Sequence, residues 1–418
     1  MNSFTYTKPQ SSEIEDPEER KMESFRILAR RLLRPSNQDV KELSILHPGQ
    51  GDAFLVEEAA AYCFKAIDEG ATCLNLNEVI WPDSFSTKNV VEALIKSPYC
   101  NVSKNQQTTT EDQQNILPLQ LEISSSETPW LYLNKYWYAE KVIAEQIILR
   151  QTRSLTGETP SVEQISNAIQ SHDLLKIGEK GCLSPMQVRA LGAITQKNFV
   201  VLTGGPGTGK TTIINAVIDV YCQLNEIQDV EDALVLAAPT GRAAKRMNEL
   251  TGFPSSTIHR LLGIAIDSPE ENFEDKEING EFLIIDEMSM VDTWLMNRVL
   301  KAAPDRLKIL LVGDSNQLPS VGPGQVLTDL LETKSIPSME LKRIHRQTNQ
   351  SSIVELAHCI KDGFLPNNFA QKQLDRSFLP CTPERLVSII EQVVVAALKK
   401  GYTKKDIQVL APMYKGDS

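Results

Sequence analysis

A lysine in a glycine-rich turn is the first candidate for chemistry in this chain. The turn reads Thr203-Gly204-Gly205-Pro206-Gly207-Thr208-Gly209-Lys210-Thr211-Thr212 and follows the apolar run 199–202. Because glycine has no Cβ, successive backbone N–H groups can point inward and form an anion nest at the start of the next helix. Lys210 then reaches the β- and γ-phosphates of a nucleotide, while Thr211 offers its hydroxyl to Mg²⁺. The pattern predicts a nucleotide site, against the simpler interpretation of an ordinary strand–helix turn.

Two adjacent acids supply the second part of this chemistry. Asp286 and Glu287 directly follow the apolar run 282–285. Asp286 is suited to hold Mg²⁺ through its water shell, and Glu287 to orient and deprotonate the water that attacks the γ-phosphate. The alternative is that they only cap the next helix. Two carboxylates at the end of a buried strand cost free energy, which favours the catalytic interpretation.

A glycine- and proline-rich run, 313–324, follows the next apolar strand and contains Gln317. An amide at this position can sense the γ-phosphate and pass its presence to the rest of the molecule. A plain turn explains the same composition equally well, so both interpretations stay open.

Two polar runs lie between these motifs, at 238–244 and 257–262. Each combines small polar groups with one arginine near the end of a predicted strand, which suits the backbone of a single nucleic-acid strand. His259 alone is more typical of a structural hydrogen bonder. The candidate contacts with single-stranded DNA are Pro239, Thr240, Arg242, Thr257 and His259.

The elements that position these residues are strands alternating with helices. The apolar runs 199–203, 234–238, 282–285 and 307–312 are separated by helical patterns. This alternation is typical of an α/β fold with a parallel sheet covered on both faces, whose ligands lie at the carboxyl ends of the strands.

The length of 418 residues predicts several domains. We expect a mainly helical, partner-docking N-terminal domain at 1–155, a linker at 156–182, an ATP-binding domain at 183–339 and the start of a second α/β domain at 340–418. In the last, a helix begins after Thr382 and a strand covers 407–411, after which the chain ends. A sheet this small buries little apolar area. We therefore expect a truncated chain or one that depends on a partner.

Two features of the N-terminal part leave alternatives open. Arg26, Arg30 and Arg34 form a helical stripe that favours a solvated face over a grip on phosphates or an acidic partner. The aromatic run 136–138 favours core packing over base stacking, because it is interleaved with apolar residues at helical spacing.

Composition excludes several classes of protein. A net charge of −11 argues against a large basic footprint for duplex DNA, so nucleic-acid contact should be confined to a groove. The seven cysteines include no C-x-x-C pair and suggest neither a disulfide framework nor a metal cluster. No apolar stretch approaches the roughly 18–20 residues that cross a bilayer, and no signal pattern opens the chain, so we expect a cytoplasmic protein without membrane partners.

Taken together, GGPGTGKTT, APTGRAAKRM, TIHRLLG, LIIDEMSMVD, LVGDSNQLPSVGPGQVL and LKRIHRQ resemble the successive motifs of the RecD family, 5′→3′ helicases of superfamily 1, across residues 183–347. The resemblance implies RecA-like domains that use ATP and Mg²⁺. It also implies that Gln187 reads adenine, against a plain helix-surface glutamine, and that Arg346 reaches the γ-phosphate across the cleft between the domains. Residues 263–281 then become either a strand-separating hairpin or an acidic solvated loop.

The N-terminal part is similar to the leading domain of the alpha chain of exodeoxyribonuclease V, through LYLNKYWYAEKVIAEQI and CLNLNEVI. That resemblance implies a helicase subunit that acts on single-stranded DNA with RecB- and RecC-like partners in double-strand break repair and recombination. Stand-alone RecD-like helicases share the same motor, and a nucleotide-binding scaffold without motor activity is a further alternative. We see no nuclease constellation.

The departure from the family is at the C-terminal end. The late motifs, one of which supplies a second arginine to the ATP site, are absent from residues 1–418. Since an arginine finger contributes about 10³–10⁵ in rate, we expect this chain alone to bind ATP but to hydrolyse it poorly.

Overall fold

The computed structural model describes residues 16–33, 51–82, 85–104, 117–152, 160–171, 185–205, 207–264, 275–341 and 351–410. They fall into two compact units, Met1–His345 and Arg346–Ser418. The first unit holds both the nucleotide-binding motifs and the N-terminal module, by which we mean the described part of residues 16–133. The predicted domain boundaries at 155, 182 and 339 stay predictions.

A six-stranded parallel sheet is the centre of the first unit. In spatial order its strands are β10 (Ser338–Leu341), β5 (Phe199–Gly204), β9 (Lys308–Gly313), β8 (Phe282–Ile285), β6 (Leu234–Ala238) and β7 (Ser255–Thr257). The predicted parallel α/β sheet is confirmed. Strand β9 lies between β5, which precedes the glycine-rich turn, and β8, which precedes the two acids.

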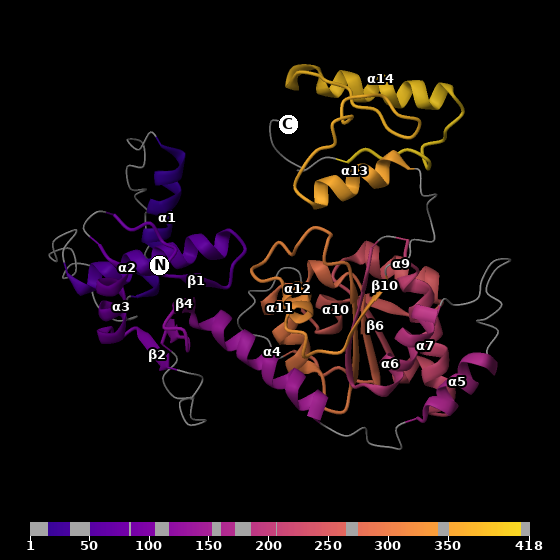
Figure 1. The fold of residues 1–418 in the computed structure, drawn as a ribbon, viewed down its shortest axis with the longest axis horizontal. Helices are drawn as coiled ribbons and strands as arrows, with labels where there is room; N and C mark the ends of the chain where they lie inside the picture. Colours follow the sequence, from indigo (N-terminus) through magenta and orange to yellow (C-terminus); the bar gives the residue numbers. More distant parts are fainter. Residues whose placement is uncertain are drawn as a thin grey trace, which may run out of the picture. The chain divides into compact units, whose positions relative to one another are not determined.

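Helices cover both faces of this sheet. Side chains alternate between the two faces along each strand, and because the central strands are largely apolar along their length, both faces must be buried. Val201, Leu283 and Leu311 point to one face, and Leu202, Ile284 and Leu310 to the other. Figure 1 shows the two helical layers with the strands between them. The first face packs against α4 (Asn134–Thr152), α10 (Ile258–Leu261), α11 (Thr293–Ala302) and α12 (Val326–Glu332). The second packs against α5 (Val162–Ser171), α6 (Pro185–Gln196), α7 (Lys210–Leu224) and α9 (Gly241–Thr251).

The N-terminal module combines helices with a second, smaller sheet. Its strands β1 (Cys73–Asn75), β4 (Pro129–Leu133), β3 (Leu119–Ile123) and β2 (Cys100–Lys104) lie in that order. Helices α1 (Pro17–Leu32), α2 (Asp52–Asp68) and α3 (Thr87–Lys96) complete its core. Helices hold most of the module's described residues. The run NVSK at 101–104 lacks apolar alternation and is a strand because it pairs with β3.

The arginine stripe of α1 is not a solvated face, so that interpretation was wrong for the two arginines that the structure describes. Arg26 Nε donates to Glu58 Oε1 at 2.6 Å, and Arg30 Nε donates to Glu57 Oε1 at 2.5 Å. Both acceptors lie on α2, so the stripe holds two helices of the module together. Arg34 lies outside the described residues.

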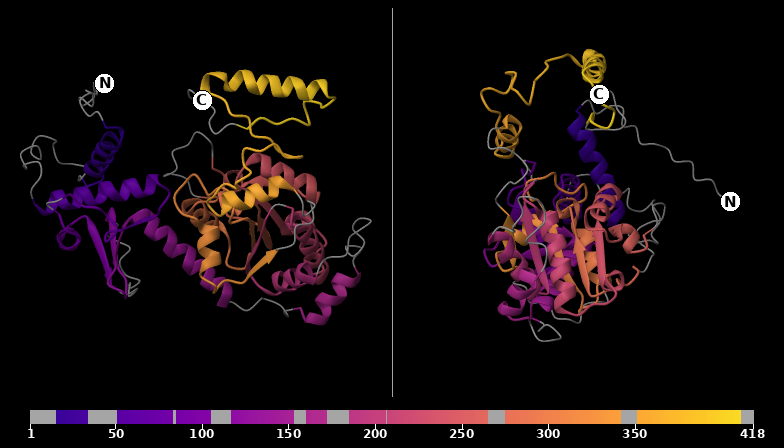
Figure 2. Two further views of the ribbon diagram at one scale, coloured as in Figure 1. Left: turned by 45° about the horizontal axis from the view of Figure 1, so that its top comes forward. Right: turned by 90° about the vertical axis from the view of Figure 1, so that its right-hand side faces the viewer.

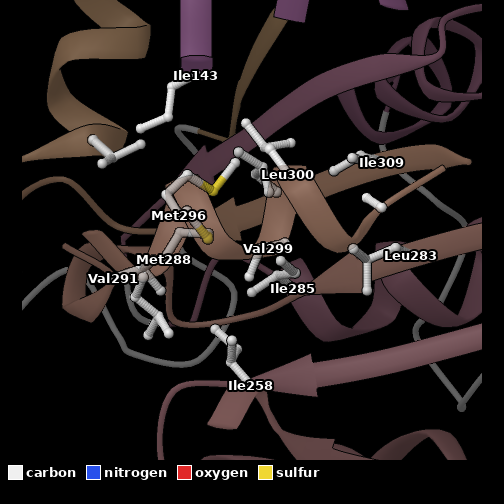
Figure 3. Packing of buried hydrophobic residues seen from close by; sticks show 14 of the residues in the cluster. Ile143, Ile258, Leu283, Ile285, Met288, Val291, Met296, Val299, Leu300 and Ile309 are labelled. Atoms are coloured by element: carbon white, nitrogen blue, oxygen red, sulfur yellow. The ribbon is translucent and has the colours of Figure 1, made fainter. Parts of the chain in front are cut away.

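Helix α4 joins the N-terminal module to the large sheet. Tyr136, near its start, lies in the core of the module, which confirms core packing for that residue. Ile143 and Ile147, two and three turns later, belong to the core of the large sheet, and Figure 3 shows Ile143 facing α11 near Met296 and Leu300. One helix therefore buries residues in both cores.

Among the described residues 351–410 of the second unit, the regular elements are helices joined by turns and irregular segments. It contains α13 (Ser352–Lys361), the short 3-10 helix η4 (Pro383–Arg385) and α14 (Leu386–Lys399), which Figure 2 shows in orange and yellow. The predicted helix after Thr382 is confirmed. The predicted strand is wrong for 407–410, which have no neighbouring strand among the described residues to pair with. Among the described residues, no helix is both long and apolar enough to cross a membrane.

Candidate nucleotide-binding site

The glycine-rich turn closes between the buried strand β5 and helix α7. Gly207 and Gly209 have φ of 78° and 88°, a conformation that glycine adopts without strain. The Thr208 hydroxyl donates to the Gly205 carbonyl at 2.8 Å, and Lys210 Nζ donates to the carbonyls of Gly204 and Gly205 at 2.5 and 3.2 Å. The lysine therefore lies along the loop that would hold phosphates. Pro206 lies outside the described residues.

Gln187 lies directly against this turn. A Cβ placed on Gly209 would be 2.8 Å from Gln187 Nε2, so the amide packs closely against the backbone of the turn. The side chain is buried, although it is on the first turns of α6, well before the glycine-rich loop in sequence. The alternative of a plain helix-surface glutamine is wrong, because the fold brings Gln187 into the phosphate-binding turn. Its role in reading adenine stays a prediction.

Asp286 and Glu287 lie where β8 ends, beside β6. The Asp286 backbone N–H donates to the Ala237 carbonyl at 3.0 Å, and Asp286 Oδ1 accepts from the Glu287 N–H at 2.8 Å. Burial raises the pKa of Asp286, while the Glu287 N–H and the positive charge of Lys210 oppose that rise. The lysine of the turn and the first acid are thus within electrostatic reach of each other.

Glu287 is held in an uncommon backbone conformation, with φ of 56°. A non-glycine residue costs about 1–3 kcal/mol in such a region, and such residues cluster at functional sites. Burial raises the pKa of Glu287, and the charges of Asp286 and Asp314 add to the rise while Lys210 opposes it. A base with a raised pKa suits proton abstraction from water near neutral pH.

The loop after β9, residues 314–324, which we term the sensor loop, begins beside these acids. Asp314 is buried, with 2% of its surface exposed; its Oδ1 accepts from Asn316 N–H at 3.0 Å and its carbonyl from Gln317 N–H at 3.1 Å. These bonds form a tight turn that leaves the Gln317 side chain exposed. Because β9 lies between β5 and β8, the loop leaves the sheet between Lys210 and the acids.

Sequence reasoning missed Asp314 and Arg246 as members of this site. Asp314 contributes charge beside Glu287, and Arg246 acts on the pKa of both Asp286 and Glu287. The signal for Asp314 was its place directly after an apolar strand. Arg246 lies one helical turn after Arg242 on α9, and its influence on the acids depends on the packing of α9 beside β6.

The candidate DNA contacts lie at or just after the carboxyl ends of the neighbouring strands β6 and β7, which pair at Ala238 and Thr257. Arg242 and His259 are exposed, and Pro239 is half-buried. Thr240 and Thr257 also cap helices, because their hydroxyls accept from Ala243 N–H and Arg260 N–H, both at 3.2 Å. The fold brings all five residues to one edge. Their contact with DNA stays a prediction.

Two residues at this edge carry oxygens of the kind that Mg²⁺ prefers. Thr211 supplies a hydroxyl and Asp286 a carboxylate, and Mg²⁺ prefers a few such oxygens together with substrate phosphates and water. No group of three or more His, Cys, Asp or Glu suited to a metal occurs among the described residues. Arg346 lies outside the described residues, and so do 265–274 from the segment considered as a strand-separating hairpin.

Comparisons with known proteins agree with this geometry. A family model described as an AAA domain matches residues 182–383. The ATP-dependent RecD2 DNA helicase of Deinococcus radiodurans is 35% identical over 290 residues, which are 68% of this chain and 36% of that protein. The RecBCD enzyme subunit RecD of Mycolicibacterium smegmatis is 28% identical over 361 residues, 79% of this chain and 58% of that protein. This chain is a relative of the RecD helicases.

The similarity to RecD proteins covers only part of this chain and part of each relative. The matched AAA stretch takes in Lys210, Asp286, Glu287 and Gln317, whereas the N-terminal module lies outside it. This chain spans about a third to somewhat more than half of the length of these RecD relatives. Among solved structures, the Pif1 helicase of Candida albicans is 20% identical with a TM-score of 0.37, covering 51% of this chain and 55% of that one.

Proposed function

We propose that this chain is an ATP-hydrolysing 5′→3′ DNA helicase subunit that acts on single-stranded DNA. The observation that carries the proposal is one sheet edge on which the lysine turn, the acid pair and the sensor loop follow the adjacent strands β5, β8 and β9. The candidate DNA contacts follow β6 and β7 on the same edge. The proposed nucleotide site and the proposed DNA contacts are therefore neighbours on one sheet edge.

Each residue has a distinct part in the proposed reaction. The turn's N–H groups and Lys210 bind and orient the phosphates of ATP, with Gln187 at the base. Glu287 accepts a proton from the attacking water, and Gln317 reports whether a γ-phosphate is present. Mg²⁺, held by Thr211 and Asp286, would neutralise charge on the phosphate oxygens. Arg346 is proposed to add a positive charge to the γ-phosphate during turnover.

The proposed setting is an exodeoxyribonuclease V-type complex with RecB- and RecC-like subunits, in cytoplasmic double-strand break repair and recombination. The printed name of the mycobacterial relative, a RecBCD subunit, supports this setting. A stand-alone helicase is the second candidate, since the printed name of the RecD2 relative, which is 35% identical, gives a DNA helicase and names no complex.

Steady-state ATPase activity of the chain, with and without oligo-dT, tests the motor. We expect turnover by this chain alone to be slow, because the late arginine motif is absent from it, and to rise when DNA is added. Lys210→Ala should weaken nucleotide binding and remove turnover. Glu287→Gln should retain nucleotide binding and lower kcat by about 10²–10⁴, the usual contribution of a general base. Lys96→Ala is the matched control, because that lysine is exposed on α3.

Nucleotide binding without DNA-stimulated turnover in the unaltered chain would contradict the motor and support the scaffold alternative. Co-purification with RecB- and RecC-like proteins tests the setting. Full DNA-stimulated unwinding by the chain alone, with no binding to those proteins, would instead favour the stand-alone helicase.

A further inference from the structure

The far end of the sensor loop is fastened to the N-terminal module. Gly324 N–H donates to the Gly70 carbonyl at 2.9 Å. Gly70 follows the last turn of α2, in the module, whereas Gly324 ends the loop that starts at Asp314 beside the acids. This hydrogen bond joins two segments that are distant in sequence, and it involves backbone atoms alone because both residues are glycines.

The approach at this point is close enough to require glycine. Gly324 has φ of 95°, and a Cβ placed on it would lie 1.9 Å from Thr293 Oγ1 and 3.1 Å from Thr72 Cγ2. Thr293 is the first residue of α11, and Thr72 belongs to the module. The loop end is therefore enclosed between the two.

Thr72 is itself held in place. It is 9% exposed, and its hydroxyl donates to Glu140 Oε1 at 2.5 Å. Glu140 lies on α4, the helix whose Ile143 and Ile147 are buried in the large core. Movement of Thr72 away from Gly324 would thus break a hydrogen bond to a helix that is anchored on the large sheet.

The bond at Gly324 reaches the rest of the loop through a short network. The Ser320 hydroxyl is 2.8 Å from the carbonyls of both Gly322 and Gly324, and Thr293 N–H donates to the Pro323 carbonyl at 3.1 Å. Gln317 closes the Asp314 turn with its backbone N–H, three residues before Ser320. Its position therefore depends on two anchors, one at Asp314 in the sheet and one at Gly324 on the module.

We propose that the Gly70–Thr72 segment of the N-terminal module positions the sensor loop, and that Thr72 and Gly324 are positioning residues for ATP turnover. The proposal rests on the function proposed above. Its consequence is that a change in the module, such as contact with a partner, alters turnover through Gly324 without a change in the nucleotide pocket.

Substitutions at Thr72 in the full chain test this proposal. Thr72→Val keeps the shape but removes the hydroxyl donor, whereas Thr72→Ser keeps the donor. We expect Thr72→Val to lower kcat about fivefold or more, the range typical of coupling between sites, with KM unchanged and Thr72→Ser close to the unaltered chain. Hydrogen exchange should rise in peptides covering 314–324 but not in those covering 199–213.

Gly324→Ala is the second variant, with Gly363→Ala as its matched control. Gly363 has a similar φ of 81°, but a Cβ added to it would meet nothing within 4 Å, so it shares the backbone strain without the crowding. Only Gly324→Ala should raise exchange in the sensor loop.

Two results would overturn the proposal. One is a Thr72→Val chain with unaltered kcat and unaltered exchange in 314–324. The other is exchange that rises equally in all peptides, which marks general destabilisation. The proposed function fails separately, if Lys210→Ala leaves turnover unchanged; the exchange measurement still tests the loop in that case.

Discussion

Lys308 is a lysine inside the large sheet, at the first position of β9, with 4% of its surface exposed. Its Nζ donates to the Thr195 carbonyl at 3.0 Å and lies 5.7 and 5.6 Å from the ring centres of Tyr221 and Phe282. Burial lowers the pKa of Lys308 to about 7. A single residue therefore makes the stability of this sheet depend on pH.

The sign of that dependence follows from proton linkage. In the unfolded chain the lysine has its ordinary pKa of about 10.4. Below about pH 7 both states are protonated, and the folded state carries the full cost of a buried charge. As pH rises from there toward 10, the unfolded state holds more protons. The free energy of unfolding then gains at most about 1.4 kcal/mol per pH unit from this group.

Lys308→Met should remove this contribution. The free energy of unfolding of the variant, relative to the unaltered chain, should be highest near pH 6 and should fall as pH rises toward 9.5. Urea unfolding at several pH values measures the difference, in which all other titrating groups cancel. Lys197→Met, at an exposed position, is the control. A difference that does not change with pH would contradict the prediction.

Among the elements, α4 does the most to connect the first unit. Besides Ile143 and Ile147, it carries Arg150, which is 1% exposed. Arg150 Nη2 donates to the carbonyls of Ala303 and Pro304, just after α11, at 2.7 and 3.1 Å. The last turn of α4 is therefore hydrogen-bonded to the backbone just after α11, a helix that covers one face of the large sheet.

Arg150→Leu should weaken this connection. One nitrogen, Nη2, donates to both carbonyls, so their contributions do not simply add, and a hydrogen bond from a charged group contributes about 1.5–3 kcal/mol. We expect thermal and urea unfolding to show a loss of about 2–4 kcal/mol. Gln151→Ala, at the exposed next position, should change stability by less than about 0.5 kcal/mol. An equally small change for Arg150→Leu would show that α4 is held by apolar packing alone.

For the whole molecule, a net charge of −11 limits how DNA can be bound. This charge argues against a large basic footprint, so contact should involve few phosphates at the edge formed by β6 and β7. Arg242 is exposed at this edge, whereas Arg306 is exposed before the amino end of β9, on the opposite edge of the sheet.

The salt dependence of single-strand binding tests this picture. For single strands, each contacted phosphate contributes about 0.7 to the slope of log affinity against log salt. Arg242→Ala should make the slope shallower by about that amount, and Arg306→Ala should leave it unchanged. Fluorescence anisotropy of labelled oligo-dT at several KCl concentrations measures both. Equal effects of the two substitutions would indicate a diffuse charge effect and contradict a local groove.

Much of the nucleotide site could be predicted from local sequence. The turn ending at Lys210, the acids after 282–285 and the alternation of strands and helices are patterns within short windows, and local sterics and strand periodicity determine what such windows form. The same holds for the helix after Thr382. Short strands such as 100–104, with weak alternation, could not be predicted, because their pairing partner decides them.

What the sequence determined by itself is the chemistry: a lysine turn, an acid pair and a polar loop, in an order that predicts one sheet edge. Only the tertiary structure decided which distant residues join them. Gln187 against Gly209, Arg246 near the acids and Gly70 bonded to Gly324 are contacts between segments far apart in the chain. These contacts depend on packing, because residues remote in sequence meet only when the two cores and the helix α4 between them have formed.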